Sequence, residues 1–214
     1  ASRAGVDEAT GQTPNAGFRV TFDPALQTGP YTGRVYVLVN GRLGREPRRA
    51  QDWTKPPAIY AVDLVNADPT QPVLVDGSEV AFPVPLAQLP SREYAIQAIA
   101  RRSLDHPVPG EGVGDLFSEA LVRTLNGAEP AGVIELTLDK AVEERPAKEH
   151  ERIRYVELES RLLSDFHKRP IKLRAGVLLP AGWTPEGTET YPTLYMFTGF
   201  GGDHRHVAFQ RGLT

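Results

Sequence analysis

Short hydrophobic stretches, separated by turns that contain glycine and proline, run through residues 16–139. This pattern predicts strands at 17–22, 31–41, 58–66, 72–82, 92–102, 119–125 and 132–139. The stretch 72–82 contains Asp76-Gly77, a pair that favours a hairpin turn, so we expect it to form two short strands.

Two of these segments indicate which of their faces are buried. The segment 31–41 has Val35, Val37 and Val39 on one face and further apolar side chains on the other, which predicts a central strand. The segment 132–139 alternates apolar and polar residues, which predicts one buried and one exposed face. Many short strands without a long amphipathic helix favour a mainly β fold, with an antiparallel β-sandwich that we expect to be immunoglobulin-like.

Composition and charge along the chain suggest four parts. They are a flexible lead-in at 1–15, the β-sandwich domain at 16–139, a charged linker at 140–152 and a second part at 153–214. The alternating charges of residues 45–49 predict a solvated loop.

The hydrophobic pattern changes after the linker. Residues 154–163 and 171–180 read as two strands, and 164–170 as the turn that makes them an antiparallel hairpin. A surface loop is expected at 181–192. Residues 193–197 are apolar on both faces, which is typical of a strand buried in a parallel sheet.

Overall composition excludes several classes of function. A net charge of −3 and a pI near 6.0 give no electrostatic reason to expect a nucleic-acid or anionic-membrane partner. The chain has no cysteine, which excludes disulfides, a thiolate zinc site and a cysteine nucleophile. It has no run of about 18 apolar residues, so we expect no membrane span. The chain begins without methionine, which fits signal-peptide removal or a cut fragment, and we expect a periplasmic or secreted location.

A glycine cluster follows the last apolar segment, in the sequence Thr-Gly-Phe-Gly-Gly at 198–202. Such a cluster forms either a tight turn or a surface of backbone N–H groups that faces negative charge. The spacing matches neither a dinucleotide-binding motif nor a P-loop, and we expect no cofactor. Asp203, His204 and His206 are possible metal ligands, but neighbouring residues rarely all point at one ion, so we expect no metal.

The order of several short motifs resembles the start of a known enzyme group. Leu179-Pro180 ends the second hairpin strand, Tyr191-Pro192 precedes the next strand, and the glycine cluster follows it. In this order they resemble the beginning of the esterase D-like and feruloyl-esterase-like group of α/β-hydrolases. The resemblance covers roughly residues 152–214.

The resemblance implies a serine ester hydrolase that acts on a small-molecule or carbohydrate-linked ester. It also implies that the backbone N–H of Phe200, or next that of Gly201, belongs to the oxyanion hole. Expected residues of the substrate mouth are Gly199, Gly202, Asp203 and His204.

The catalytic residues of that group have no match here. No Gly-x-Ser-x-Gly occurs, and the glycine pair of that motif is lacking around six serines, which are Ser78, Ser91, Ser103, Ser118, Ser160 and Ser164. We therefore expect the nucleophile, acid and histidine after Thr214, and no activity in these residues alone. By the same resemblance, a strand that neighbours 193–197 would also follow Thr214, and the domain at 153–214 would be incomplete. We therefore expect 193–197 either to lack its normal neighbours or to pair elsewhere, leaving an apolar edge. Alternatively, the sandwich is a binding module for carbohydrate or a protein partner, with Trp53 as a sugar platform or a loop anchor. The oligomeric state stays open.

Overall fold

The chain divides into two compact units, which are described separately here. Unit 1 comprises Ala1–Glu143 and unit 2 comprises Glu144–Thr214, so the boundary lies inside the predicted linker. The structure is a computed structural model, and it describes residues 16–50, 52, 54–127, 132–147, 150–199 and 202–212. Within these residues no helix is long and apolar enough to cross a membrane.

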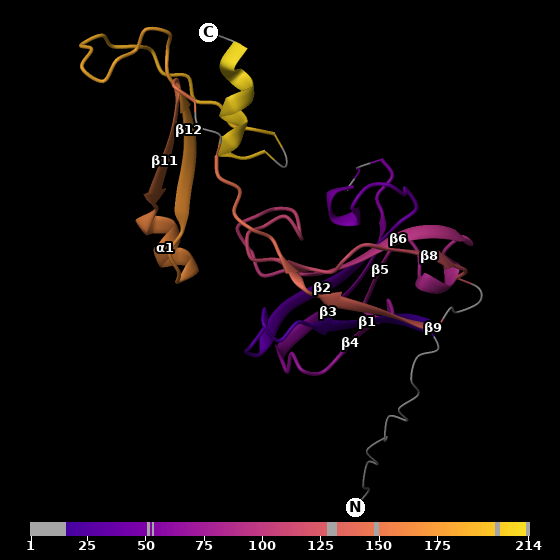
Figure 1. The fold of residues 1–214 in the computed structure, drawn as a ribbon. Helices are drawn as coiled ribbons and strands as arrows, with labels where there is room; N and C mark the ends of the chain where they lie inside the picture. The colour runs from indigo at the N-terminus through magenta and orange to yellow at the C-terminus, as the bar shows by residue number, and fades with distance from the viewer. Residues whose placement is uncertain are drawn as a thin grey trace, which may run out of the picture. The chain divides into compact units, whose positions relative to one another are not determined.

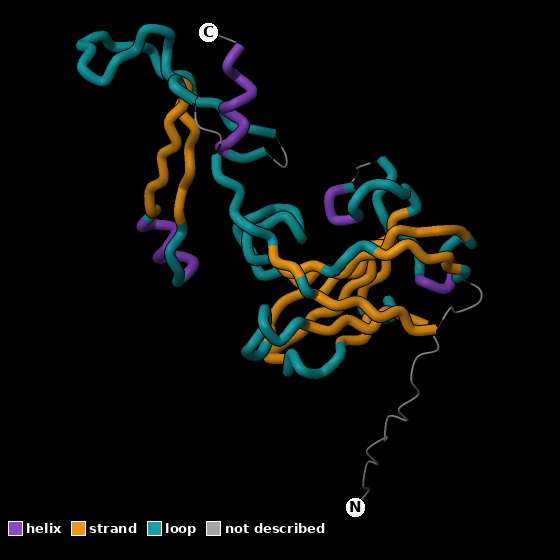
Figure 2. The backbone as a smooth tube through the Cα atoms, in the orientation of Figure 1, coloured by secondary structure: helices purple, strands orange, loops and turns teal. Residues whose placement is uncertain are grey.

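Unit 1 consists of two β-sheets, which makes the fold mainly β (Figures 1 and 2). The three-stranded sheet has the order β4 (Val73–Val75), β1 (Ala16–Phe22), β9 (Gly132–Leu138). The seven-stranded sheet has the order β10 (Lys140–Ala141), β7 (Leu116–Phe117), β6 (Arg92–Ala100), β2 (Tyr31–Asn40), β3 (Ala58–Ala67), β5 (Val80–Phe82), and β8 (Leu121–Leu125) also pairs with β6. Two short 3-10 helices, η1 (Pro47–Arg49) and η2 (Leu86–Gln88), lie in the connections.

The core of unit 1 lies between its two sheets and follows the alternation in the sequence. Val35, Val37 and Val39 of β2 are buried, and β2 lies between β3 and β6, which confirms the predicted central strand. On β9 of the other sheet, Leu136 and Leu138 are buried while the polar residues beside them are exposed, as predicted. The two faces together form one apolar cluster.

The hairpin expected around Asp76-Gly77 is wrong. β4 pairs with β1, whereas β5 pairs with β3 in the other sheet, so the turn carries the chain from one sheet to the other. The Asp76 side chain accepts a hydrogen bond from the Ser78 N–H at 2.9 Å, and Gly77 has a φ of +81°. A Cβ at Gly77 would come within 2.9 Å of the Tyr60 ring, so this close approach favours glycine.

The sandwich is not wholly antiparallel. β1 and β9 run parallel over their full length, from Ala16 opposite Gly132 to Phe22 opposite Leu138. Exposed polar side chains also meet across this pair, where Arg19 donates to Glu135 at 2.8 Å. The other described pairs of unit 1 are antiparallel, as predicted.

A buried carboxylate holds the loops that enter β7. Asp115 is fully buried, and its Oδ1 accepts hydrogen bonds from the backbone N–H groups of Arg102 and Ser103, both at 2.7 Å. Its Oδ2 accepts a third from the Gly110 N–H at 2.9 Å. One side chain therefore satisfies three backbone donors, of which the Gly110 N–H is buried and the other two are part-buried.

Unit 2 is built on an antiparallel pair, β11 (Ile153–Glu159) and β12 (Lys172–Leu178), which confirms the predicted pairing. The predicted turn at 164–170 is wrong, because the connection contains helix α1 (Arg161–His167). Ser160 caps this helix by accepting a hydrogen bond from the Leu163 N–H, and Lys168 ends it in a left-handed conformation. A long 3-10 helix, η3 (His204–Gly212), follows the glycine cluster.

The buried strand predicted at 193–197 is also wrong. These residues have no regular secondary structure, and the exposed fractions of Leu194 and Phe197 are 84% and 93%. Apolar side chains of the hairpin, such as Val156 and Leu173, are exposed as well. A strand needs a neighbour to satisfy its backbone groups, and no strand among the described residues lies beside 193–197.

Replacing Asp115 with alanine is expected to destabilise unit 1 by about 3 kcal/mol, because one buried and two part-buried N–H groups lose their acceptor. Chemical denaturation followed by circular dichroism measures this change. Glu111→Ala, at an exposed position in the same loop region, serves as the matched control and is expected to have little effect. Equal stability of the two variants would contradict the stabilising role of the Asp115 side chain.

Candidate functional site

The glycine cluster forms a tight turn just before η3. The Gly202 N–H donates to the Gly199 carbonyl at 3.0 Å. A Cβ at Gly202 would lie 2.5 Å from the Cβ of Thr198, so the turn closes only without a side chain there. Phe200 and Gly201, the predicted oxyanion donors, lie outside the described residues.

Asp203 is held by the residue two positions after it. Its Oδ1 accepts the Arg205 N–H at 2.8 Å, and its Oδ2 accepts Nε of the same arginine at 2.7 Å. The guanidinium also donates to the carbonyl of Arg145 at 3.3 Å. Burial by itself raises the pKa of Asp203, but the hydrogen bonds from Arg205 outweigh it and hold this pKa below its ordinary value.

His206 receives a hydrogen bond from the same turn. The Asp203 N–H donates to Nδ1 of His206 at 3.0 Å, which assigns the proton of the neutral ring to Nε2. Nδ1 of His206 also lies 3.5 Å from Oδ1 of Asp203, but Nδ1 already accepts the hydrogen bond from the Asp203 N–H. The contact between the two residues is therefore part of the turn.

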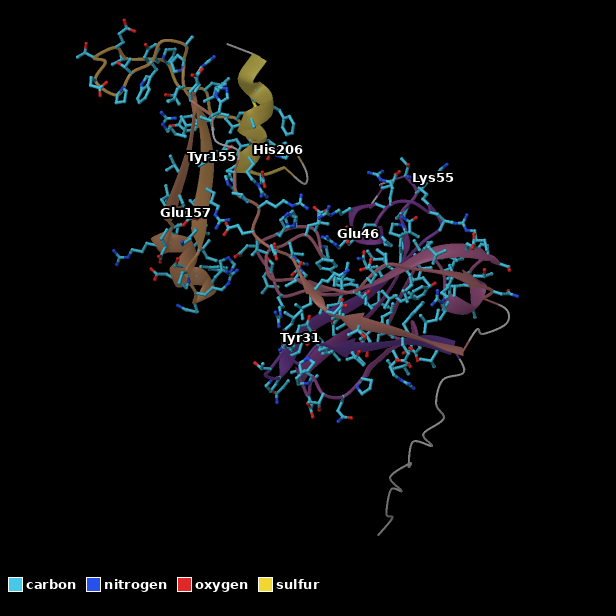
Figure 3. The ribbon with its side chains drawn as sticks, in the orientation of Figure 1. Tyr31, Glu46, Lys55, Tyr155, Glu157 and His206 are labelled. Atoms are coloured by element: carbon cyan, nitrogen blue, oxygen red, sulfur yellow. The ribbon has the colours of Figure 1, made fainter. Side chains whose placement is uncertain are left out.

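η3 lies directly on the hairpin through His204 and Val207. The ring of His204 meets the ring of Tyr155 edge to face, with centroids 5.8 Å apart; Tyr155 is labelled on β11 in Figure 3. A Cβ at Gly176 of β12 would lie 2.4 Å from the His204 carbonyl oxygen and 2.5 Å from Val207. Gly176 thus allows the helix to approach the strand. Burial lowers the pKa of His204, although the negative charge of Asp203 acts to raise it.

Asp203 and His204, the two residues of the predicted mouth that have side chains, contact residues outside it. Both oxygens of Asp203 face Arg205, and His204 faces Tyr155. In the part of the chain that the structure describes, no three histidine, cysteine or acidic side chains are grouped so that they could hold a metal ion. What the turn offers chemically is therefore its backbone.

Three of the serines have structural partners. Ser118 is buried, accepts the Ala98 N–H and donates to the Glu119 carbonyl. Ser160 caps α1, and Ser164 accepts the Ile171 N–H at 2.8 Å. Trp53, the predicted sugar platform or anchor, lies outside the described residues.

Gly176 and Tyr155, which position η3, are not among the functional residues predicted from the sequence. The signal for Gly176 was present, because a glycine inside a strand often marks the close approach of another segment. No comparable signal identifies Tyr155, since an aromatic residue is common in any strand.

The chain was compared with protein-family models, curated proteins and solved structures. No protein-family model, curated protein or solved structure matches the chain.

Gly176→Val is expected to displace η3 from β12, because the added atoms would overlap with His204 and Val207. Overpacking of this kind costs about 1–3 kcal/mol, so amides of η3 should exchange with deuterium roughly tenfold faster or more. Ala175→Val, at the exposed neighbouring position, is the control and should leave η3 protected. Unchanged exchange in Gly176→Val would contradict the packing described here.

The Asp203 contact is expected to weaken in acid. Its lowered pKa means that the contact is fully present above the ordinary value of 3.8 and is lost as the pH falls through the folded value. The Arg205 amide proton, which donates to Asp203, reports this in an NMR titration as a midpoint below 3.8. Asp203→Asn should abolish the titration, and a midpoint at or above 3.8 would contradict the assignment.

Proposed function

We propose that unit 2 is the first part of the hydrolase domain of a serine ester hydrolase, and that its glycine cluster contributes to the oxyanion hole. The observation that carries this proposal is the glycine turn at 198–202, which leads directly into a helix packed on the hairpin. A turn fixed in this way can present backbone N–H groups to a ligand without interference from a Cβ.

The chemistry required of such a turn is limited and well defined. When a serine attacks an ester carbonyl, the carbonyl oxygen becomes negatively charged in the tetrahedral intermediate. Backbone N–H donors fixed beforehand stabilise that charge, and one donor contributes about 3–4 kcal/mol. By the resemblance in sequence, Phe200 and Gly201 are the residues proposed to supply them.

The exposed apolar surface of unit 2 supports the view that further structure completes it. Among the residues described in this unit, Ile153 is the one buried hydrophobic residue, with an exposed fraction of 4%. The apolar segment 193–197 lies in water, although its composition suits a buried strand. We propose that a further part of the same enzyme covers this surface and carries the nucleophile.

The decisive variant is Phe200→Pro in a chain extended along its reading frame through a Gly-x-Ser-x-Gly motif. Proline removes the N–H, so kcat for p-nitrophenyl ester hydrolysis should fall about a hundredfold to a thousandfold. Phe200→Ala keeps the N–H and is the matched control, for which we expect most of kcat to remain. Circular dichroism checks that both variants fold.

Two outcomes would contradict the proposal. One is an extended chain that has no esterase activity. The other is activity in the 214 residues alone that disappears when one of their serines is replaced.

A further inference from the structure

A hollow of about 360 Å³ lies within the loop that follows β12. Two turns shape it, because the Trp183 N–H donates to the Pro180 carbonyl at 3.3 Å and the Gly187 N–H donates to the Thr184 carbonyl at 3.1 Å. Its lining residues are Gly182, Trp183, Thr184, Glu186, Gly187, Thr188, Glu189 and Tyr191. The volume falls within the range of small-molecule sites.

The lining combines two aromatic rings with hydroxyl and carboxylate groups. Trp183 is half-buried, and Tyr191 is exposed enough to offer its ring to a ligand. The Tyr191 hydroxyl donates to Oε2 of Glu189 at 2.6 Å, which orients both side chains. The lining contains two glutamates and no basic residue, so the hollow carries negative charge.

We propose that this hollow binds a neutral sugar unit of an oligosaccharide. A sugar ring has an apolar C–H face, which suits the indole of Trp183, and hydroxyl groups at its edge that donate to carboxylates and exchange hydrogen bonds with threonine hydroxyls. Glu186 and Glu189 repel acidic sugars. The site needs no esterase chemistry, so it stands or falls separately from the function proposed above.

The indole itself provides the assay, because the chain contains only two tryptophans. In a Trp53→Phe variant of the whole chain, Trp183 is the one remaining fluorophore of this kind. Titration with cello-, xylo- and manno-oligosaccharides is expected to give a saturable change in its emission with at least one of them. An oligogalacturonate, which carries carboxylates, is expected to give none.

Calorimetry then tests individual side chains in variants that keep Trp53. Trp183→Ala should raise the Kd for the responding sugar about tenfold or more. Glu186→Gln should raise the Kd by a smaller factor and should also reduce the discrimination against oligogalacturonate. Because the loop is exposed, these variants are expected to keep the circular dichroism spectrum of the parent.

Three results would overturn the inference. They are the absence of a response to all three neutral sugars, binding that Trp183→Ala leaves intact, and tighter binding of choline than of any sugar. The last result would assign the hollow to an organic cation held by the rings and carboxylates.

Discussion

Burial of apolar side chains between two sheets is the interaction that holds unit 1 in one arrangement. β1 and β9 supply one wall through residues such as Phe18 and Leu138, and β2 and β6 supply the other through residues such as Val37 and Ile96, all nearly or fully buried. Each buried side chain of this size contributes about 1.5–3 kcal/mol. The parallel pair β1–β9 depends on this core, because its two strands are far apart in sequence and need many contacts to offset the cost of closing the chain.

Unit 2 buries fewer apolar side chains than unit 1, and individual local contacts hold its elements together. Gly176 admits η3 against the strand, Tyr155 contacts His204, and Arg205 holds Asp203. These contacts fix the end of the glycine turn without a large core around it. The sequence indicated the turn, but the residues that position it lie on the hairpin and cannot be identified from the motif itself.

The predictions from sequence succeeded where a pattern depends on one strand and failed where it depends on a partner. Alternation along β2 and β9 identified their buried faces, because that pattern is local. The helix after Ser160 is short, and its start depends on a single cap. Residues 193–197 have the composition of a strand but lack a neighbour. Arg48 was read as solvated, yet it is 5% exposed, because its guanidinium lies 4.0 Å from the centre of the Phe117 ring.

Electrostatics near the glycine turn bears on the proposed oxyanion role. An ionised Asp203 beside a developing negative charge would oppose catalysis, since like charges at short range raise each other's energy. Arg205 bonds to both oxygens of this carboxylate and balances its charge. The lowered pKa of His204 favours the neutral ring, so this side chain adds little charge beside the turn. Removal of one backbone donor is therefore a sharper test of the proposed oxyanion role than replacement of a charged side chain that is already paired.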